Sequence, residues 1–441
     1  MAHLGRDKRT MRHVSGKCVA ACLVALALAA CERPDAAAIA RWKGSPEAEG
    51  KLAAVVKDGK VPAPVRGEAA AALVELGLGQ QMQAAISGLD IGERALVIPA
   101  IVPYLARQLA GGDKGGDARD ALFALREQAT TQDARQALEQ VLYPALVADA
   151  RAGRERVGRY ALLDMLVGIG APTVPLLLPL LADPAVPFAT PVAVIDKVGD
   201  GAAHEKGGDA LVVRAKQQDP IPEPLWPALA TLAGKQVSAF LIATVEQGHG
   251  PDVARAATAM AKMPPRTPGL SAFAVGKAAD PRTPDDLRAQ MFAVAEREHG
   301  EESRKALLAL IADTKNDSKI RDRAFQAVVK ASGGQVILEA LEAFPPHARL
   351  TSAELRSEIV APLSAMPGMD TRGPLFKAMQ SKSPLARLVA ILVLEKMGFK
   401  SDAGPLGKLV KDPGTVPGLA PEDQVGRAAV RAIATLTKSG F

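Results

Sequence analysis

Cys31 carries the side chain whose chemistry depends most clearly on its neighbours in the sequence. It ends the run of small and apolar residues "LVALALAAC" and is followed at once by the polar stretch "ERPD". The other two cysteines, Cys18 and Cys22, lie in the same N-terminal segment. The chain beyond Cys31 therefore has no disulfide, no thiol nucleophile and no thiolate ligand for a metal. The chemistry to be explained is that of one thiol at the end of an apolar segment.

The segment before Cys31 has the three parts of an export signal. It begins with basic residues, continues as an apolar run from Cys18 to Ala30 and ends on small residues. A helix that spans a bilayer needs about 20 apolar residues, so this shorter run is not expected to remain as a permanent anchor. The sequence Leu28-Ala29-Ala30-Cys31 resembles the lipobox of bacterial lipoproteins. The resemblance implies cleavage between Ala30 and Cys31 and a diacylglycerol group on the Cys31 sulfur.

The lipobox resemblance also implies where in the cell envelope the protein is located. Several acyl chains on one terminus hold a protein stably on a membrane, whereas a single chain is marginal. Lipoproteins of double-membrane bacteria pass to the outer membrane unless an aspartate follows the cysteine, and here Glu32 follows it. We therefore expect a signal peptide over 1–30, a lipidated tether over 31–45, and attachment to the outer membrane facing the periplasm. The alternatives are a plain signal peptide cut elsewhere and a helix that stays uncleaved.

The net charge of +6 does not indicate a nucleic-acid partner. Residues 1–30 contain five basic residues and one acidic residue, out of 54 and 48 in the whole chain. The remainder is nearly balanced in charge, unlike a surface that follows a phosphate backbone. Because 48% of the residues are hydrophobic but only 3% are aromatic, the core must be built from Ala, Leu, Val and Ile. Interdigitated helices suit that composition better than sheets.

A repeating pattern organises the chain over 46–441. In "VRGEAAAALVELG" Arg66 precedes Gly77 by 11 residues, and in "LARLVAILVLEKMG" Arg387 precedes Gly398 by the same interval. Related copies contain Arg288, Arg321 and Arg356, which are separated by steps of 33 and 35 residues. Weaker copies lie at 118–129 and 154–170. The repeating arginines are Arg66, Arg156, Arg255, Arg288, Arg321, Arg356, Arg387 and Arg427.

Each repeat is predicted to be a pair of helices joined by short turns. Glycine after the first helix permits a left-handed cap, and Asp-Pro ends the second because the residue before proline avoids helical dihedrals. Helix starts are marked by the capping boxes Thr283–Asp286 and Thr351–Glu354. The helix predicted over 385–397 is apolar on almost every side, so neighbouring pairs must bury it from several directions.

At this point the chain resembles the HEAT-repeat family of armadillo-type proteins. The segment "SPLARLVAILVLEKMGFKSDAGPLGKLVKDP", Ser383–Pro413, carries the resemblance best, and the repeats from Pro251 onward follow it strongly. The resemblance implies an all-α superhelical solenoid of antiparallel helix pairs. In HEAT proteins the repeating arginine pairs with a carboxylate of the neighbouring repeat, which implies Asp183, Asp280 and Asp412 as partners. We prefer this structural ladder to an alternative in which the arginines bind an anionic ligand.

Two stretches interrupt the repeat. Residues 183–227 contain seven prolines and a polar Gly-rich insert, and 110–117 form a shorter one, "AGGDKGGD". The longer stretch is either an irregular hairpin with a long loop or a seam between two segments, and we expect one interrupted solenoid. We expect the carboxylates of these inserts to lie in solvated loops, because they lack the dense alternation and closing glutamate of a calcium loop. They are Asp113, Asp117, Asp200, Glu205 and Asp209.

No group of residues after Cys31 has the spacing of a catalytic or metal site. The histidines His204, His249, His299 and His347 lie about 45 to 50 residues apart, and no two have the spacing on a helix that would bring them to one metal. There is also no P-loop, nucleophile elbow or dinucleotide fingerprint. We therefore expect no catalytic residue, no metal and no cofactor.

The sequence thus predicts a non-catalytic scaffold that binds an unknown protein or peptide. Binding is placed on a concave face lined by the second helices of the repeats. Two alternatives remain open. One is a HEAT-like enzyme or cofactor-handling lyase subunit, which would need several titratable groups converging in one cleft. The other is a purely architectural envelope protein without a dedicated groove.

Overall fold

A computed structural model describes residues 34–110, 115–264, 269–297, 300–345, 350–366 and 368–438. Within these ranges the regular structure is helical apart from one short antiparallel hairpin, which pairs β1 (Arg156–Val157) with β2 (Tyr160–Ala161). The predicted all-α class is confirmed. The proposed cleavage site at Ala30 and Cys31 lies outside the described residues, as do Asp113, His299 and His347.

The chain divides into two compact units. Unit 1 holds Met1–Leu180 and Val186–Val194, and unit 2 holds Leu181–Ala185 and Ile195–Phe441. The division falls at the start of the interrupted stretch 183–227, and helix α11 (Ala189–Val198) contributes residues to both units.

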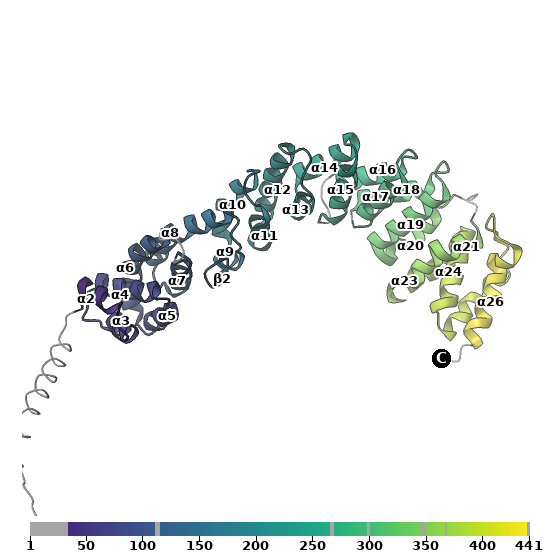
Figure 1. Cartoon of the computed structure of the whole chain (residues 1–441). Helices are drawn as coiled ribbons and strands as arrows, with labels where there is room; N and C mark the ends of the chain where they lie inside the picture. Colours follow the sequence, from purple (N-terminus) through teal and green to yellow (C-terminus); the bar gives the residue numbers. More distant parts are fainter. Residues whose placement is uncertain are drawn as a thin grey trace, which may run out of the picture. The chain divides into compact units, whose positions relative to one another are not determined.

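In unit 1, α4 lies at the centre of the packing and contacts both α3 and α6. Helix α6 continues the array by packing against α7 and α8, as the purple and blue part of Figure 1 shows. The helices are α2 (Ala36–Trp42), α3 (Ala48–Lys57), α4 (Ala63–Glu75), α5 (Gly79–Ser87), α6 (Ile91–Leu109), α7 (Gly115–Gln128), α8 (Gln132–Arg151), α9 (Leu162–Ile169) and α10 (Val174–Leu181), with the 3-10 turn η2 (Ala171–Thr173).

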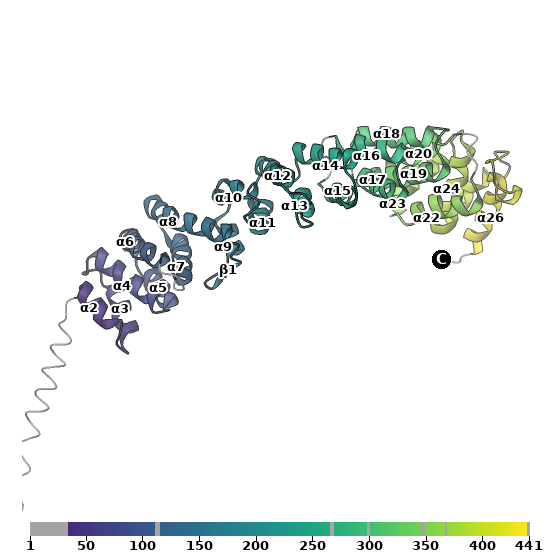
Figure 2. The same cartoon turned by 45° about the horizontal axis from the view of Figure 1, so that its top comes forward.

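Unit 2 begins with two rows of helices that alternate along the chain. The first layer is α13 (Leu225–Thr231), α15 (Pro251–Lys262), α17 (Asp285–Arg297) and α19 (Ser318–Ser332), each contacting the next. The second layer is α12 (Gly201–Lys216), α14 (Lys235–Gln247), α16 (Leu270–Ala279), α18 (Glu301–Ala312) and α20 (Ile337–Ala343), also in successive contact. Figure 2 shows the two rows side by side. This alternation is the stacking of helix pairs that the repeat predicts.

The C-terminal part of unit 2 is more irregular. Its helices are η3 (Gly333–Val336), α21 (Ser352–Glu354), the π-helix η4 (Leu355–Val360), α22 (Ala361–Ser364), α23 (Gly368–Ala378), α24 (Pro384–Met397), η5 (Lys400–Asp402), α25 (Ala403–Gly407), η6 (Pro421–Asp423) and α26 (Val425–Lys438). Helix α24 buries residues on nearly every side, as predicted for 385–397. Helix α26 instead buries one face and leaves Arg427 and Val430 exposed.

The prediction of one helical copy over 154–170 is wrong in its first half. Gly158 adopts φ +71°, and the chain turns back there as the β1–β2 hairpin. The Asp120 carboxylate on α7 accepts a hydrogen bond from the Arg159 backbone N–H at 2.6 Å. A Cβ atom on Gly158 would lie 2.6 Å from Asp120 Oδ2. A glycine in the left-handed region and a buried carboxylate therefore hold a turn where the repeat pattern indicates a helix.

The prediction of a solvated loop around 200–209 is also wrong. Residues 201–216 form α12, and Asp200 caps its start by accepting from the Ala203 backbone N–H at 2.8 Å. Glu205 and Asp209 lie on the helix itself, while Asp117 lies in the first turn of α7. The residues of this insert carry helix signals, a capping aspartate and an apolar stripe, that the adjacent glycines Gly207 and Gly208 obscure.

The predicted helix punctuation is confirmed in part. Gly77 has φ +76° after α4, and Thr351 and Glu354 form the predicted capping box. Gly398 does not adopt the left-handed cap, because its φ is −78°. A Cβ atom there would lie 2.3 Å from the Leu394 carbonyl oxygen. Glycine is needed at this position because the Leu394 carbonyl group lies too close to leave room for a side chain.

Candidate functional site

Several repeating arginines donate to backbone carbonyl oxygens in the segment that precedes their own helix. Arg66 is 4% exposed and its Nε donates to the Val56 carbonyl at 2.8 Å. Arg288 Nη2 donates to the Thr283 carbonyl at 2.8 Å, and Arg321 Nη1 to the Asn316 carbonyl at 2.5 Å. Carbonyls at helix ends and turns lack partners within the helix. The guanidinium groups supply those partners and so fasten one helix to the turn before it.

The three predicted carboxylate partners behave differently from one another. Asp412 receives Arg387 in a bidentate pair, with Nε to Oδ2 at 2.7 Å and Nη2 to Oδ1 at 2.9 Å. Arg387 lies on α24 and Asp412 lies in the segment that follows α25, within the same predicted repeat, so the partner does not come from the neighbouring repeat. Burial raises the pKa of Asp412, but the hydrogen bonds from Arg387 and the Gly414 N–H have the larger effect. The pKa of Asp412 is therefore lower than that of an ordinary aspartate.

Asp280 and Asp183 do not pair with a repeating arginine through their carboxylates. Asp280 binds Arg282, whose hydrogen bonds lower the pKa of Asp280 to about 2, and only its carbonyl oxygen receives Arg288. The Asp183 carboxylate accepts from the Ala185 N–H, and its carbonyl accepts from Arg214 at 2.9 Å. The ladder therefore combines arginine-to-carbonyl bonds with ion pairs to carboxylates other than the predicted ones, such as Arg66 with Glu93 at 3.4 Å and Arg288 with Asp285 at 2.7 Å.

The remaining repeating arginines do not form one continuous row. Arg156 is exposed in β1, and Arg427 is exposed on α26. Arg255 Nη1 lies 3.3 Å from Asp252 Oδ1 within α15, and Arg356 Nη2 lies 3.7 Å from Asp423 Oδ1. This scatter fits individual structural contacts and gives no support to a single anion-binding surface along the arginines.

Sequence reasoning missed a buried pair in unit 1. Arg119 Nε lies 2.5 Å from Asp149 Oδ2, and Arg154 Nη1 lies 2.9 Å from Asp149 Oδ1. Asp149 is 1% exposed. This pair joins α7 to α8 in the way that Arg387 and Asp412 join α24 to the segment that follows α25. The weak copy at 118–129 contained the signal, because Arg119 stands near its start.

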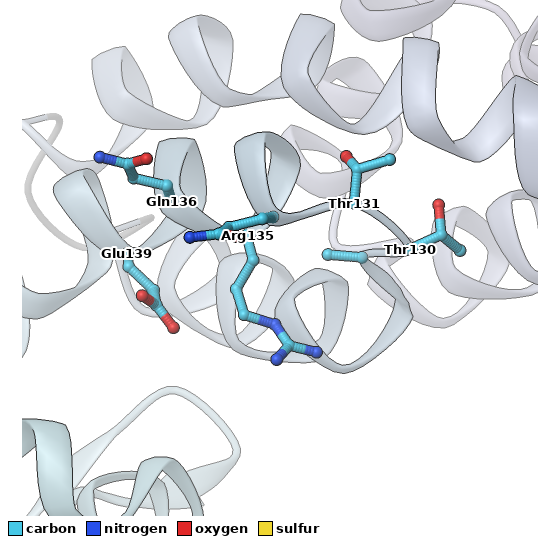
Figure 3. A pocket seen from close by; sticks show the side chains of 7 residues that line it. Thr130, Thr131, Arg135, Gln136 and Glu139 are labelled. Carbon is cyan, nitrogen blue, oxygen red and sulfur yellow. The ribbon is translucent and has the colours of Figure 1, made fainter.

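A polar pocket of about 590 Å³ lies at the start of α8 in unit 1. In Figure 3 Arg135 and Glu139 extend toward the same side of the helix, while Gln136 points the other way. Thr131 Oγ1 accepts from the Ala134 N–H at 3.2 Å, and Glu139 Oε1 accepts from Arg126 Nε at 2.9 Å. These polar groups already have partners within the chain, so the pocket gives no ligand assignment.

A less polar groove of about 610 Å³ lies between α13 and α15 in unit 2. One wall contains Trp226, which is 3% exposed and stacks on Phe240 with ring centroids 6.3 Å apart. Within the described residues the Trp226 indole N–H has no hydrogen-bond acceptor. The groove is lined by Glu223, Pro224, Trp226, Pro227, Ala254, Arg255, Thr258, Ala259 and Lys262. The run "PEPLWP" of prolines around a tryptophan was the available sequence signal.

Asp322 is a buried acid between α19 and the π-helix η4. It is 4% exposed, and its Oδ1 has no partner in the described part of the chain. Burial, together with the nearby carboxylates Glu354 and Glu358, raises the pKa of Asp322 to about 7 against a smaller lowering by Arg321. A proton on Asp322 is thus held at a pH where an ordinary aspartate has lost it.

We expect the Asp322→Asn variant to be more stable than the wild type at pH 8, by on the order of 4 kcal/mol at most. The folded wild type holds the Asp322 proton to a higher pH than the unfolded chain does. Its free energy of unfolding should therefore fall as pH rises from about 4 to about 7. The neutral asparagine removes that slope. Urea unfolding at pH 4.5 and pH 8 measures the difference, and an unchanged slope in the variant would contradict the expectation.

The histidines that the structure describes remain apart. His204 lies on α12, where its Nδ1 is 2.8 Å from the Asp200 carbonyl oxygen, and His249 is exposed between α14 and α15. Among the described residues no three His, Cys, Asp or Glu side chains are grouped as metal ligands would be.

Across those same ranges, no single helix has the length and apolar character to cross a membrane. The pair Leu162–Ile169 and Ala171–Leu181, bent by 109°, meets both criteria only when taken together.

Comparison with known proteins adds no family. No protein-family model matches the chain, and no curated protein matches it. A solved structure with some likeness is the crystal structure of an engineered protein from a structural genomics consortium. It is 15% identical and the alignment covers 90% of this chain and 100% of that chain, with a TM-score of 0.22. A likeness at that TM-score carries no argument about this chain, so its function must be argued from its own residues.

Proposed function

We propose that this chain is an exported, lipid-anchored helical-repeat protein that binds a protein or peptide without catalysing a reaction. The observation that carries the proposal is the groove between α13 and α15, with a buried and unpartnered Trp226 N–H in its lining. Concave sites that combine apolar lining with a few polar groups are where proteins bind ligands. The anchor is proposed from Cys31 and the apolar run before it.

The proposed binding surface belongs to the first layer of helices. The sequence placed binding on the second helices of the repeats, whereas α13 and α15 form the first layer of unit 2. Pro224 and Pro227 line the groove at the start of α13, where their missing N–H groups cost no hydrogen bond within the helix.

A photo-crosslinking residue placed at Thr258 tests the proposed function in cells. Thr258 is exposed on α15 and lines the groove. We expect a crosslinked adduct of discrete mass from this position. The matched control places the same residue at Lys305, which is exposed on α18. Equal adducts from both positions, or none from Thr258, would contradict binding in the groove.

A further inference from the structure

The groove between α13 and α15 has a cation toward each end. Arg255 and Lys262 are seven residues apart on α15 and both line the groove. Seven residues are close to two turns of a helix, so the two side chains leave the same side of α15 about 10.5 Å apart along its axis. Thr258 and Ala259 lie between them on that side. The floor between the charges is therefore made of small side chains.

These two cations have spare capacity for a ligand. Asp252 engages Arg255 through Nη1 at 3.3 Å, and a guanidinium has five N–H donors. Among the described residues Lys262 has no ion pair. Glu223 is the one carboxylate in the lining. The groove thus offers more positive than negative groups to whatever enters it.

Trp226 adds an aromatic ring to the same lining, and its indole N–H is fully buried without an acceptor among the described residues. Its ring is held against Phe240, so the indole N–H cannot turn freely toward another acceptor. A buried donor without a partner costs about 1 to 3 kcal/mol. The lining itself is short of acceptors, because Glu223 is its one carboxylate against Arg255 and Lys262, and its ligand should therefore bring carboxylate oxygens.

We propose that the groove binds an extended peptide segment with two carboxylates four residues apart and small apolar side chains between them. An extended chain rises about 3.3 Å per residue and its side chains alternate between two faces, so residues four apart leave the same face about 13 Å apart, within reach of the long Arg255 and Lys262 side chains. The small floor at Thr258 and Ala259 leaves room for the residues between the acids. The proposal rests on the proposed function, since it names the partner class of the same groove.

A library of random peptides displayed on phage tests this specificity. The full chain, purified in mild detergent, is used as bait in three forms: wild type, the double variant Arg255→Glu with Lys262→Glu, and a control. The control reverses two exposed lysines of unit 2 outside the groove, Lys235→Glu with Lys305→Glu. We expect wild type and control to enrich peptides with two acids four residues apart. The groove variant should bind those peptides about tenfold more weakly for each reversed charge.

The Trp226 indole N–H gives a second readout that does not depend on charge reversal. The chain has two tryptophans, so ¹⁵N-labelled tryptophan gives two indole signals, and Trp226→Phe assigns one of them. An enriched peptide should move the Trp226 signal and leave the Trp42 signal in place.

Three outcomes would overturn the proposal: no enrichment, the same peptides enriched by the groove variant, or a Trp226 signal that does not move. If the Thr258 crosslink still succeeds, binding in the groove stands and only the acidic class fails. If neither succeeds, the proposed function fails as well.

Discussion

We expect the Gly208→Ala variant to have a free energy of unfolding about 2 kcal/mol lower than that of the wild type. Gly208 is buried in the middle of α12, and a Cβ atom there would lie 2.2 Å from the Leu232 carbonyl oxygen and 2.7 Å from Val237 Cγ2. The carbonyl belongs to the backbone at the end of α13, which cannot move as a flexible side chain could. Overpacking costs about 1 to 3 kcal/mol or more. This outweighs the gain of about 1 kcal/mol that alanine brings to a helix.

Gly276→Ala is the matched control because it makes the same substitution in a helix of the same unit. Gly276 lies within α16, and no atom lies within 4 Å of a Cβ placed on it. This variant should therefore be more stable than wild type by up to about 1 kcal/mol. Urea unfolding followed by circular dichroism measures both variants. Changes of the same sign in the two would show that α12 does not approach the end of α13 this closely.

The same glycine explains why α12 could not be predicted from the sequence. Gly207 and Gly208 lower helix propensity by about 1 kcal/mol each relative to alanine, and with Asp200 before them they are typical of a loop. Tertiary packing requires glycine at these two positions, because the backbone of α12 passes so close to the end of α13 that side chains do not fit. Helix propensity depends on residues near one another in sequence, so it does not reveal a contact between segments some 25 residues apart.

The strongly periodic parts of the fold could be predicted. The apolar helix α24, the capping box at Thr351 and the alternation of helix pairs in unit 2 follow from residues near one another in sequence. The β1–β2 hairpin could not, because it depends on Asp120, nearly 40 residues earlier, which binds the Arg159 N–H. Local patterns specify elements, whereas long-range polar contacts redirect them.

The arginines show the same limit at the level of single side chains. Their spacing predicted that they recur, but not what they bind. Every residue has a backbone carbonyl oxygen, so the sequence does not show which carbonyl an arginine will bind. The bonds from Arg66 to Val56 and from Arg321 to Asn316 could therefore not be predicted. The groove escaped prediction for a related reason, since its two walls come from α13 and α15 and meet only after the helices stack.

Replacing Cys31 by serine is expected to move the protein from the membrane fraction to the soluble fraction. Each buried CH₂ of an acyl chain contributes about 0.8 kcal/mol, and stable attachment takes more than one chain. Serine has no thiol to carry the lipid, so the whole of that contribution is lost. The substitution replaces a single side-chain atom, and we expect thermal unfolding to be unchanged. Fractionation with a high-salt wash separates lipid attachment from charge attraction, which salt weakens.

Cys22→Ser is the control, because Cys22 lies inside the apolar run and not at its end. This variant should stay with the membrane. The mass of the purified chain then separates the two alternatives to a lipobox. An uncleaved helix would keep residues 1–30 and leave the Cys31→Ser variant in the membrane fraction. A plain signal peptide cut elsewhere would leave the wild type soluble and free of lipid. Only cleavage before Cys31 predicts a shortened, lipidated wild type and a serine variant that leaves the membrane, since both events require the same thiol.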